Sequence, residues 1–311
     1  MKLITIVTAC YNEEENINAV YEQVKAVFET LPQYRYEHLF IDNASQDKTV
    51  EILKTIAKDD KNVKIIVNAR NFGHIRSPSY ALLQAKGDAV ISIVADLQDP
   101  PEMIKAFLQK WEEGYRIVIG VKEKTNESKG CAAIRKFYYQ LITRISEAPL
   151  VKDFTGFGLY GQSVIQILRE MDDPYPYFRG LIAEIGFEIA RIPYEQPPRK
   201  EGKTKNNFYT LFDMAMLGIT SHSKVPIRMM TIVGFILSSI SFSMAVVFLL
   251  LKLMFWHHFN VGIAPMLIGL FFFSSVQLFF IGMLGEYIAA IHTQVLKRPL
   301  VIEKERVNFD V

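Results

Sequence analysis

Carboxylate and amide side chains gather in four short polar clusters, each of which directly follows an apolar stretch of the sequence. The clusters are residues 11–13, Asp42, residues 68–74 and residues 96–99. A glutamate and an aspartate in neighbouring clusters can accept hydrogen bonds from ribose hydroxyls and a base N–H. The oxygen atoms of residues 96–99 are ligands that Mg²⁺ or Mn²⁺ takes when it also holds phosphates. These residue types favour a metal-assisted nucleotide site, and the alternative is that they are solvated acids of surface loops.

Several common catalytic motifs are absent from the sequence. No Gly-x-Gly-x-x-Gly follows the first apolar stretch, and neither a Gly-x-x-x-x-Gly-Lys-Ser/Thr loop nor a Gly-x-Ser-x-Gly elbow is present. The two cysteines give no disulfide framework and no metal-ligand spacing. The adjacent His257 and His258 are more typical of polar loop residues than of metal ligands. A usual dinucleotide-binding loop and P-loop phosphoryl transfer are therefore disfavoured.

The charges of the chain are nearly balanced, with 35 basic and 33 acidic residues among 311. This balance does not suit an electrostatic nucleic-acid binder, so no nucleic-acid partner is expected. Residues 3–10 form a short apolar run that is followed at once by acidic residues, whereas a signal peptide needs a longer apolar region and a cleavage site. The soluble part is therefore expected to stay in the cytoplasm.

Strand and helix patterns alternate along the first part of the chain. Apolar, β-branched stretches typical of strands occupy residues 3–10, 38–41, 63–67, 89–94 and 116–120. Helical spacing of apolar residues occurs at residues 17–28, 49–57, 77–85 and 103–113. The alternation predicts a mainly parallel, doubly wound α/β sheet, in which ligands bind beyond the carboxyl ends of the strands. The four polar clusters fall at those ends and should line one crevice.

The pattern is less regular in the following segments. Residues 137–145 are typical of a helix, residues 153–158 are typical of a loop rich in glycine and aromatic side chains, and residues 193–205 are typical of a basic linker. Residues 207–221 carry apolar side chains at i, i+3, i+4 and i+7. This spacing favours an amphipathic helix in the membrane interface over an ordinary core helix.

Two long uncharged stretches, residues 229–251 and 253–285, predict membrane-spanning helices at residues 226–253 and 264–291. Each can cross about 30 Å of hydrocarbon at roughly 1.5 Å per residue. Lysines and arginines flank the outer ends of the pair, whereas only Lys252 lies near the connecting turn. By the positive-inside rule, we expect a multi-pass protein of the inner (plasma) membrane with its catalytic domain and both termini in the cytoplasm. Glu286, at the cytoplasmic end of the second span, is more typical of an interfacial residue than of a proton relay.

These patterns divide the chain into four parts. We expect a cytoplasmic catalytic domain at residues 1–205, an amphipathic helix region at 206–225, a two-helix transmembrane hairpin at 226–295 and a cytoplasmic tail at 296–311. Small residues permit close packing of helices within or between chains, which favours a homo-oligomer. The glycines concerned are Gly234, Gly269, Gly282 and Gly285.

Five motifs occur in an order and spacing that resemble a known family. They are Thr8-Ala9-Cys10-Tyr11-Asn12-Glu13-Glu14, Asp42-Asn43-Ala44-Ser45-Gln46-Asp47, Asn68-Ala69-Arg70-Asn71-Phe72-Gly73, Ala95-Asp96-Leu97-Gln98-Asp99-Pro100-Pro101-Glu102 and Asp153-Phe154-Thr155-Gly156-Phe157. In these motifs the chain is similar to family 2 glycosyltransferases, and the resemblance implies a GT-A (Rossmann-like) domain. With two spans added, the whole chain resembles the polyisoprenyl-phosphate glycosyltransferases. The bactoprenol glucosyltransferase type, related to dolichol-phosphate mannose synthase, is the most similar.

The resemblance implies a role for each matching site residue. The residues implied to bind the nucleotide are Thr8, Tyr11, Asn12, Glu13, Asp42, Asn71 and Asp96. Asp96 and Gln98 are implied to hold Mg²⁺ or Mn²⁺ beside the diphosphate, and Asp96 is also counted as catalytic. The family usually has Asp-x-Asp-Leu-Gln, whereas Val94 replaces the first aspartate here. The metal is therefore expected to bind weakly or mostly through the nucleotide.

Basic residues are implied to bind the phosphate of a lipid. The segment at residues 199–205 matches the family pattern Arg-x-x-Gly-x-[Ser/Thr]-Lys, which makes Arg199 and Lys205 candidates, with Arg135 as a third. An arginine offers a planar fork and a lysine a point charge to such a group. A polybasic patch held to anionic lipids is the alternative, and the two interpretations are compatible.

The function implied by the resemblance is transfer of a sugar from a nucleotide sugar donor to polyprenyl (undecaprenyl) phosphate at the lipid bilayer, with inversion. UDP-glucose is the leading donor, and GDP-mannose and a UDP-aminopentose are alternatives. Asp153 stands where inverting relatives keep a catalytic carboxylate. Because a phosphate monoester is already an oxyanion near pH 7, we expect Asp153 to orient the sugar or stabilise charge rather than to act as a base.

Two other functions fit the sequence less well. A processive polysaccharide synthase is disfavoured because its Gln-x-x-Arg-Trp motif is missing and two spans are too few to line a polymer channel. A degenerate nucleotide-binding domain that serves as a membrane scaffold is the non-enzymatic alternative, and Val94 is the feature that supports it.

Overall fold

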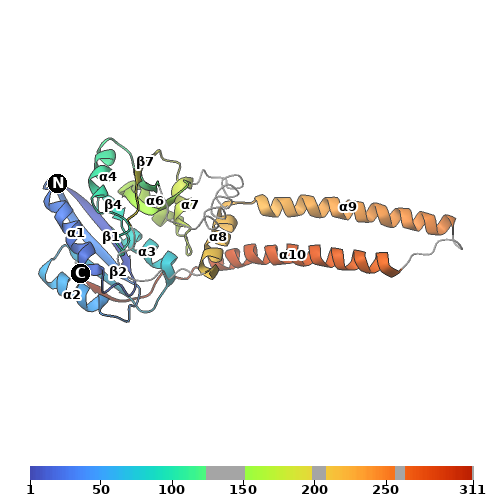
Figure 1. The fold of residues 1–311 in the computed structure, drawn as a ribbon, viewed down its shortest axis with the longest axis horizontal. Helices are drawn as coiled ribbons and strands as arrows, with labels where there is room; N and C mark the ends of the chain where they lie inside the picture. Colours follow the sequence, from blue (N-terminus) through green and yellow to red (C-terminus); the bar gives the residue numbers. More distant parts are fainter. Residues whose placement is uncertain (124–150, 198–207, 256–262, 310–311) are drawn as a thin grey trace.

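The structure is a computed structural model that describes residues 1–123, 151–197, 208–255 and 263–309 (Figure 1). Two long helices project side by side from a sheet domain, and the C-terminal segment returns to that domain (Figure 1). The expected helix at residues 137–145 lies outside the described residues. The expected fold class is confirmed, because a mainly parallel α/β sheet domain is followed by two long apolar helices.

The sheet domain is built on eight strands in the order β7-β5-β6-β4-β1-β2-β3-β8. β1 pairs in parallel with β2 and β4, β2 with β3, and β5 with β7. β6 runs antiparallel to β4 and β5, and β8 runs antiparallel to β3. The strands are β1 (Lys2–Cys10), β2 (Tyr34–Asp42), β3 (Val63–Asn68), β4 (Ala89–Ser92), β5 (Ile117–Lys122), β6 (Phe154–Gly161), β7 (Ile189–Tyr194) and β8 (Glu303–Val307).

Helices cover both faces of the sheet, which explains why its central strands are almost continuously apolar. On one face, Ile4 and Ile6 of β1 pack with α1 and α4, and on the other face Val7 packs with α3, α6 and α7. All three side chains are at most 2% exposed. The helices are α1 (Ile17–Glu29), α2 (Thr49–Asp59), α3 (Gly73–Gln84), α4 (Met103–Glu112), α6 (Gln162–Met171) and α7 (Phe178–Glu184).

The glycine-rich segment that follows Asp153 forms a strand, which corrects the expectation of a loop at residues 153–158. Phe157 and Tyr160 of β6 are at most 2% exposed. The glycines permit close packing of neighbouring strands, because a Cβ on Gly158 would lie 2.5 Å from the carbonyl oxygen of Val118 on β5. β6 therefore joins the parallel part of the sheet, through β4, to β5 and β7.

The C-terminal segment is part of the sheet rather than a separate tail at residues 296–311. β8 pairs with β3 through the register Ile65↔Val307 and Ile66↔Arg306. Asn308 donates hydrogen bonds from Nδ2 to the carbonyl oxygens of Ala57 at 2.6 Å and Val63 at 2.9 Å. The chain thus returns from the long helices to the outer edge of the catalytic sheet.

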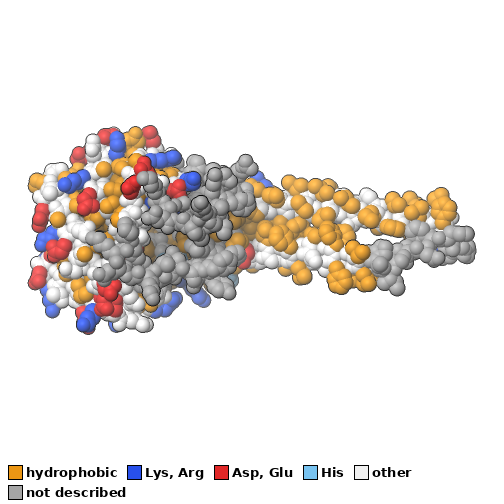
Figure 2. Space-filling model, viewed as in Figure 1, with side chains coloured by type: hydrophobic (Ala, Val, Ile, Leu, Met, Phe, Trp, Pro, Cys, Tyr) orange, Lys and Arg blue, Asp and Glu red, His pale blue; other side chains and the backbone are white. Residues whose placement is uncertain are grey.

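Two helices, Val225–Met254 and Met266–Leu296, are long and apolar enough to cross a membrane. They belong to α9 (Val225–Met254) and α10 (Ile263–Leu296), and no residue of their most apolar windows is buried. Hydrophobic side chains cover the two projecting helices, whereas charged side chains gather on the sheet domain (Figure 2). α8 (Phe208–His222) lies at the base of the pair and packs against α10.

Candidate active site

The carboxyl ends of three parallel strands lie side by side. Cys10 of β1 is in register with Asp42 of β2, and Asp42 is in register with Val67 of β3. The polar clusters after these strands therefore meet at one edge of the sheet, as the sequence predicts. β4 ends on the other side of β1, so the cluster at residues 96–99 joins the same edge.

The loops after β1 and β2 are tied together by hydrogen bonds. The backbone N–H of Asn12 donates to Ser45 Oγ at 2.8 Å, and Asn12 Oδ1 accepts from the backbone N–H of Gln46 at 2.8 Å. The backbone N–H of Glu13 donates to Thr49 Oγ1 at 2.9 Å. The predicted nucleotide-binding residues Asn12 and Glu13 thus lie in a loop that is hydrogen-bonded to the loop after β2. The side-chain oxygen of Asn12 is one of the acceptors in these hydrogen bonds.

Asp42 is fully buried at the end of β2. Its Oδ2 accepts from the backbone N–H of Ser45 at 2.9 Å, and its Oδ1 accepts from Ser45 Oγ at 2.5 Å. Burial raises the pKa of Asp42, and the hydrogen bonds from Ser45 act in the opposite direction. Asp42 therefore shapes the loop beside Asn12, and its binding to a nucleoside remains a prediction.

Thr8 lies beneath the site rather than on its surface. Its side chain is fully buried, and its hydroxyl is 3.0 Å from His38 Nε2. Burial lowers the pKa of His38 to about 3, so the ring is neutral at pH 7. In this conformation the Thr8 side chain supports the strand ends and does not face a ligand.

Three asparagines hold the loop after β3 against the loop after β2. Asn43 Nδ2 donates to Asn71 Oδ1 at 2.9 Å, and Asn68 Nδ2 donates to Asn43 Oδ1 at 3.1 Å. The same Asn71 oxygen accepts from the backbone N–H of Gly73 at 2.8 Å. Asn71, which is predicted to bind the nucleotide, is thus part of this hydrogen-bond network. Asn43 and Asn68 were not singled out from the sequence, although both lie in the quoted motifs.

The loop after β4 carries the predicted metal ligands Asp96 and Gln98. The backbone N–H of Gln98 donates to Asp96 Oδ1 at 3.1 Å, and both residues are half-buried. Leu97 between them has a left-handed φ of 58°, which is costly for a branched residue. Val94, which replaces the family's first aspartate, is 44% exposed. Asp96 and Gln98 therefore offer a carboxylate and an amide oxygen at one turn, a donor set that suits Mg²⁺ or Mn²⁺ only with additional phosphate or water ligands.

Asp99 belongs to the polar cluster predicted at residues 96–99, but the sequence assigned it no individual role. It is 3% exposed, and its Oδ1 accepts from the hydroxyl of Tyr194 at 3.0 Å, while its Oδ2 accepts from the backbone N–H of Val94 at 3.3 Å. Burial raises the pKa of Asp99 to about 6. The carboxyl thus holds the loop at residues 94–99 to the end of β7.

Asp153 directly precedes β6 and also has a left-handed backbone, with φ of 58°. The backbone N–H of Lys122 donates to its carbonyl oxygen at 3.3 Å, and Lys152 Nζ lies 3.9 Å from its Oδ2. Asn12 and Ala44 share this backbone conformation, with φ of 53° and 63°. Strained residues therefore occur after β1, after β2, after β4 and before β6, a distribution typical of functional sites.

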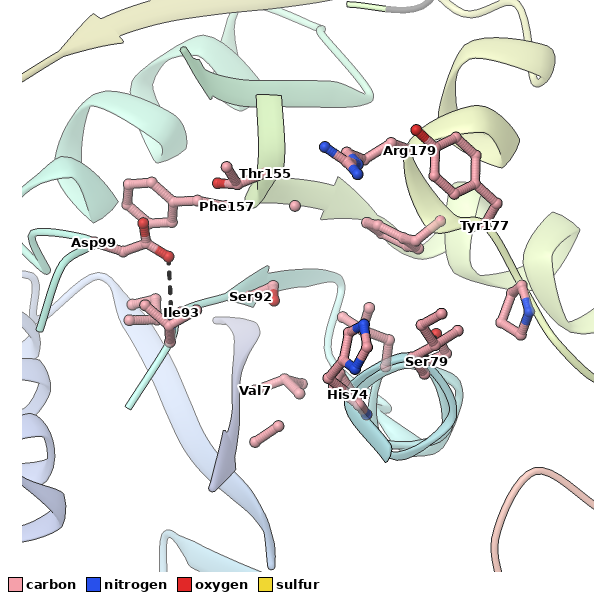
Figure 3. A pocket seen from close by; sticks show the side chains of 18 of the residues that line it. Val7, His74, Ser79, Ser92, Ile93, Asp99, Thr155, Phe157, Tyr177 and Arg179 are labelled. Atoms are coloured by element: carbon pink, nitrogen blue, oxygen red, sulfur yellow. Dashed lines mark hydrogen bonds between the residues drawn. The ribbon is translucent and has the colours of Figure 1, made fainter. Parts of the chain in front are cut away.

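A cavity of 320 Å³ adjoins these residues on the side of α3 and α7 (Figure 3). Asp99 and Thr155 lie at one end, whereas His74 and Arg179 lie on opposite walls (Figure 3). Met214 of α8 also lines it. Its remaining lining includes Val7, Ala9, Ile75, Pro78, Ser79, Leu82, Ser92, Ile93, Val94, Gly156, Phe157, Pro176, Tyr177 and Phe178.

Three predicted site residues cannot be placed in this geometry. Arg135, Arg199 and Lys205 lie outside the described residues, so their contact with a lipid phosphate remains a prediction. Tyr11 is described and half-buried in the loop after β1, beside Asn12.

The chain is similar to known proteins along most of its length. Residues 5–165 match the family model described as glycosyl transferase family 2. The glycosyltransferase YkcC of Bacillus subtilis is 32% identical over 98% of this chain and 94% of its own length. A prophage bactoprenol glucosyl transferase homolog of Escherichia coli is 30% identical over 97% of this chain and 98% of its own length. The bactoprenol glucosyl transferase of Shigella phage SfII is 31% identical over 97% of both chains.

Among solved structures, mannosyl-3-phosphoglycerate synthase from Rubrobacter xylanophilus has a remotely similar fold. The TM-score is 0.47 at 16% sequence identity, over 69% of this chain and 71% of that chain.

Proposed function

This chain is a glycosyltransferase that belongs to glycosyl transferase family 2, and from that premise we propose that it transfers a sugar to the phosphate of a polyprenyl phosphate. The leading donor is UDP-glucose, and the reaction takes place at the cytoplasmic face of the membrane with inversion at the anomeric carbon. The observation that carries the proposal is the extent of the similarity. The bactoprenol glucosyl transferase of phage SfII matches 97% of this chain, a span that includes the projecting helices as well as the sheet domain.

The acceptor supplies its own nucleophile. A phosphate monoester has a second pKa near 6, so it carries a reactive oxyanion at pH 7 without the help of a strong base. An acceptor oxygen forms a bond to the anomeric carbon, while the bond from that carbon to the nucleoside diphosphate breaks and the diphosphate leaves with the electron pair. Asp153, on the turn before β6, orients the sugar and stabilises the positive charge that develops at the anomeric carbon.

Asp96 and Gln98 are the residues that would hold Mg²⁺ or Mn²⁺, since their oxygen atoms lie on one turn. When bound, the ion supplies positive charge to the leaving diphosphate. Val94 provides no ligand where the family usually has a carboxylate, so an ion held there would need further ligands from phosphate or water. Glu13 and Asp42, in the adjoining loops, bind the nucleoside.

The membrane position follows from the acceptor. A polyprenyl tail is insoluble, so its phosphate is available to an enzyme only at the bilayer surface. α8 lies between the sheet domain and the two apolar helices, and we place it in the membrane interface. The return of β8 to β3 supports a hairpin with both outer ends on the side of the catalytic domain.

The test uses the full-length protein in lipid nanodiscs with Mg²⁺, undecaprenyl phosphate and a panel of labelled donors. We expect label in the organic phase with UDP-glucose, and none when undecaprenol replaces undecaprenyl phosphate. Preferential transfer from GDP-mannose or a UDP-aminopentose would show that the donor sugar is not glucose. The reaction would still be transfer of a sugar to polyprenyl phosphate. Absence of transfer from every donor, in a protein that melts cooperatively, would favour the membrane scaffold.

A further inference from the structure

The cavity between α3 and α7 extends from the loop after β4 to α8. Val94, Asp99 and Thr155 line its inner end, where the predicted metal loop and the start of β6 meet. Met214 lines it from α8, which packs against α10. The cavity thus lies between the predicted metal loop and α8, and its lining contains no residue of the loops directly after β1 and β2.

Positive charge is placed inside this cavity by Arg179. Figure 3 shows its guanidinium extending from the start of α7 into the cavity, opposite His74 of α3. The Arg179 guanidinium lies 5.3 Å from the ring centroid of Tyr177, and its Nη1 donates to the carbonyl oxygen of Phe154 at 3.5 Å. These contacts direct the side chain along the wall of the cavity.

His74 is neutral at pH 7 and can donate one hydrogen bond. Burial lowers its pKa first, the positive charge of Arg179 lowers it further, and Asp213 of α8 opposes both effects. His74 and Arg179 line opposite walls of the same cavity (Figure 3), so an anion bound between the walls would face both side chains. A guanidinium binds phosphate oxygens through two parallel hydrogen bonds, a geometry that lysine does not offer.

The rest of the cavity is mainly apolar. Its walls include Ile75, Pro78, Leu82, Pro176, Phe178 and Met214. A volume of 320 Å³ is at the small end of the range of roughly 300–1,000 Å³ for ligand pockets. It suits a phosphate with a short hydrocarbon segment better than a complete nucleotide sugar.

We propose that this cavity binds the phosphate head and first isoprene units of the lipid acceptor, with Arg179 as the phosphate ligand and His74 as a second hydrogen-bond donor. The inference rests on the proposed function, since it assigns the acceptor half of that reaction. Neither residue is among the basic candidates Arg135, Arg199 and Lys205. The acceptor oxygen would then lie between Arg179 and the turn that carries Asp153.

The test compares Arg179→Gln, Arg179→Lys and the wild type as full-length proteins in nanodiscs. Apparent KM values are measured separately for undecaprenyl phosphate and UDP-glucose. Loss of a charge-assisted hydrogen-bond pair should raise the acceptor KM about 10-fold to 100-fold in Arg179→Gln and less in Arg179→Lys, with the donor KM within about twofold. Arg35→Gln is the matched control, because Arg35 is exposed at the opposite end of β2.

A second measurement distinguishes a lipid phosphate from free inorganic phosphate as the anion that binds in the cavity. Binding of UDP-glucose in the absence of acceptor is measured by calorimetry, and a short isoprenyl phosphate is compared with its alcohol and with inorganic phosphate as inhibitors. We expect equal UDP-glucose affinity in all variants, and inhibition by the isoprenyl phosphate that weakens specifically in Arg179→Gln. Inhibition by inorganic phosphate alone would show that the cavity does not recognise a lipid.

The outcomes distinguish the inference from the function on which it rests. A raised donor KM or weakened UDP-glucose binding in Arg179→Gln would assign Arg179 to the donor diphosphate and overturn the inference. An unchanged acceptor KM would also overturn it. If Arg179→Gln does not fold, as judged by its melting temperature, the same comparison is decided by Arg179→Lys. A wild-type protein that transfers no sugar to any polyprenyl phosphate would instead refute the proposed function.

Discussion

In the proposed mechanism, the donor half of the site depends on the carboxylate of Asp96. It is half-buried on the turn after β4, and Val94 leaves no second carboxylate at the place where the family usually has one. We predict that Asp96→Asn lowers transfer by roughly 100-fold or more, because the charge of the leaving diphosphate is then poorly neutralised. The measurement is the initial rate of labelled lipid formation at saturating Mg²⁺.

Asp59→Asn is the control for this substitution, since Asp59 is exposed at the far end of α2. Both variants should melt within a few degrees of the wild type. An Asp96→Asn protein with unchanged turnover would remove Asp96 from the mechanism and leave the diphosphate to other residues.

His38 makes the sheet domain sensitive to acid. Its ring is fully buried, lies 3.9 Å from the ring of Phe40 between centroids, and within the described part of the chain its Nδ1 has no hydrogen-bond partner. Burial lowers the pKa of His38 to about 3, whereas an unfolded histidine titrates near pH 6.5. The unfolded state therefore binds more protons between these values, and stability falls as the pH decreases from about 6.5 toward 3.

We predict that His38→Gln removes this dependence. Between pH 7 and pH 5.5, the wild type should lose roughly 1 kcal/mol more stability than the variant. Chemical unfolding of the purified protein at both pH values measures the difference. His292→Gln, which alters an exposed histidine on α10, should retain the wild-type slope, and an equal slope in His38→Gln would contradict the assignment.

The sequence predicted the positions of polar loops best where a polar cluster follows an apolar strand. Asp42 and Asp96 meet that condition, and the strand register brings their loops to one edge. Asp99 and Arg179 did not stand out, because each acquires its role from tertiary contacts: Asp99 from Tyr194 on β7, and Arg179 from the cavity between α3 and α7. Burial of one carboxyl among several in a loop cannot be read from composition.

At the scale of elements, β6 is held in place by a glycine. A Cβ on Gly158 would lie 2.5 Å from the carbonyl oxygen of Val118 and 3.1 Å from Cα of Ile119, so β5 and β6 would have to separate. We predict that Gly158→Ala costs about 1–3 kcal/mol or more, as overpacked cores do. The change is measured as a fall in melting temperature and in the yield of folded protein.

Gly161→Ala on the same strand is the matched control. A Cβ there would meet its nearest neighbour, the carbonyl oxygen of Arg116, at 3.4 Å, and its φ of −61° suits any residue. Its melting temperature should stay close to that of the wild type. Equal melting temperatures of the two alanine variants would mean that β5 and β6 tolerate a wider spacing than the structure has.

Sequence analysis missed three strands, β6, β7 and β8, and the end of β7 corrects the start of the linker expected at residues 193–205. Two of these strands, β6 and β8, share a physical cause. β6 contains three glycines, and β8 is dominated by the charged residues Glu303, Lys304, Glu305 and Arg306. Intrinsic strand propensity is low for such residues, and pairing with neighbours decides the outcome. The regular alternation of apolar strands and helices in residues 1–120 needed no such contacts, which is why β1, β3, β4 and β5 were predicted to within two residues at each end. β2 was predicted at residues 38–41 and begins earlier, at Tyr34.

At the scale of the whole molecule, the hairpin and β8 together determine how the chain is placed in the membrane. Gly269, Gly282 and Gly285 of α10 would each meet nothing within 4 Å of an added Cβ among the described residues, whereas Gly234 of α9 faces Phe280 at 3.7 Å. One glycine thus serves packing within the hairpin, and three remain on its outer surface. Assembly through these three positions is still a prediction, and it would not alter the path of a single chain.

That path sets a topological constraint. β8 hydrogen-bonds to β3, so the end of α10 and the start of α9 must lie on the same side of the membrane as the sheet domain. An even number of crossings satisfies this constraint, and the two apolar helices are long enough to supply two. Because lysines and arginines flank the outer ends of the pair, that side should be the cytoplasm.

We predict that a cysteine at Phe255 reacts with a membrane-impermeant maleimide in intact cells, and that a cysteine at Lys304 reacts only after the membrane is opened. Phe255 is 52% exposed at the end of α9, and Lys304 is exposed on β8. Cys131→Ser removes one native thiol, and Cys10 is buried. Labelling at Lys304→Cys in intact cells would place the sheet domain outside the cell and contradict the predicted orientation. Labelling at both positions only after the membrane is opened would show that α9 and α10 do not cross the membrane. A hairpin that spans the bilayer must expose its turn on the outer side.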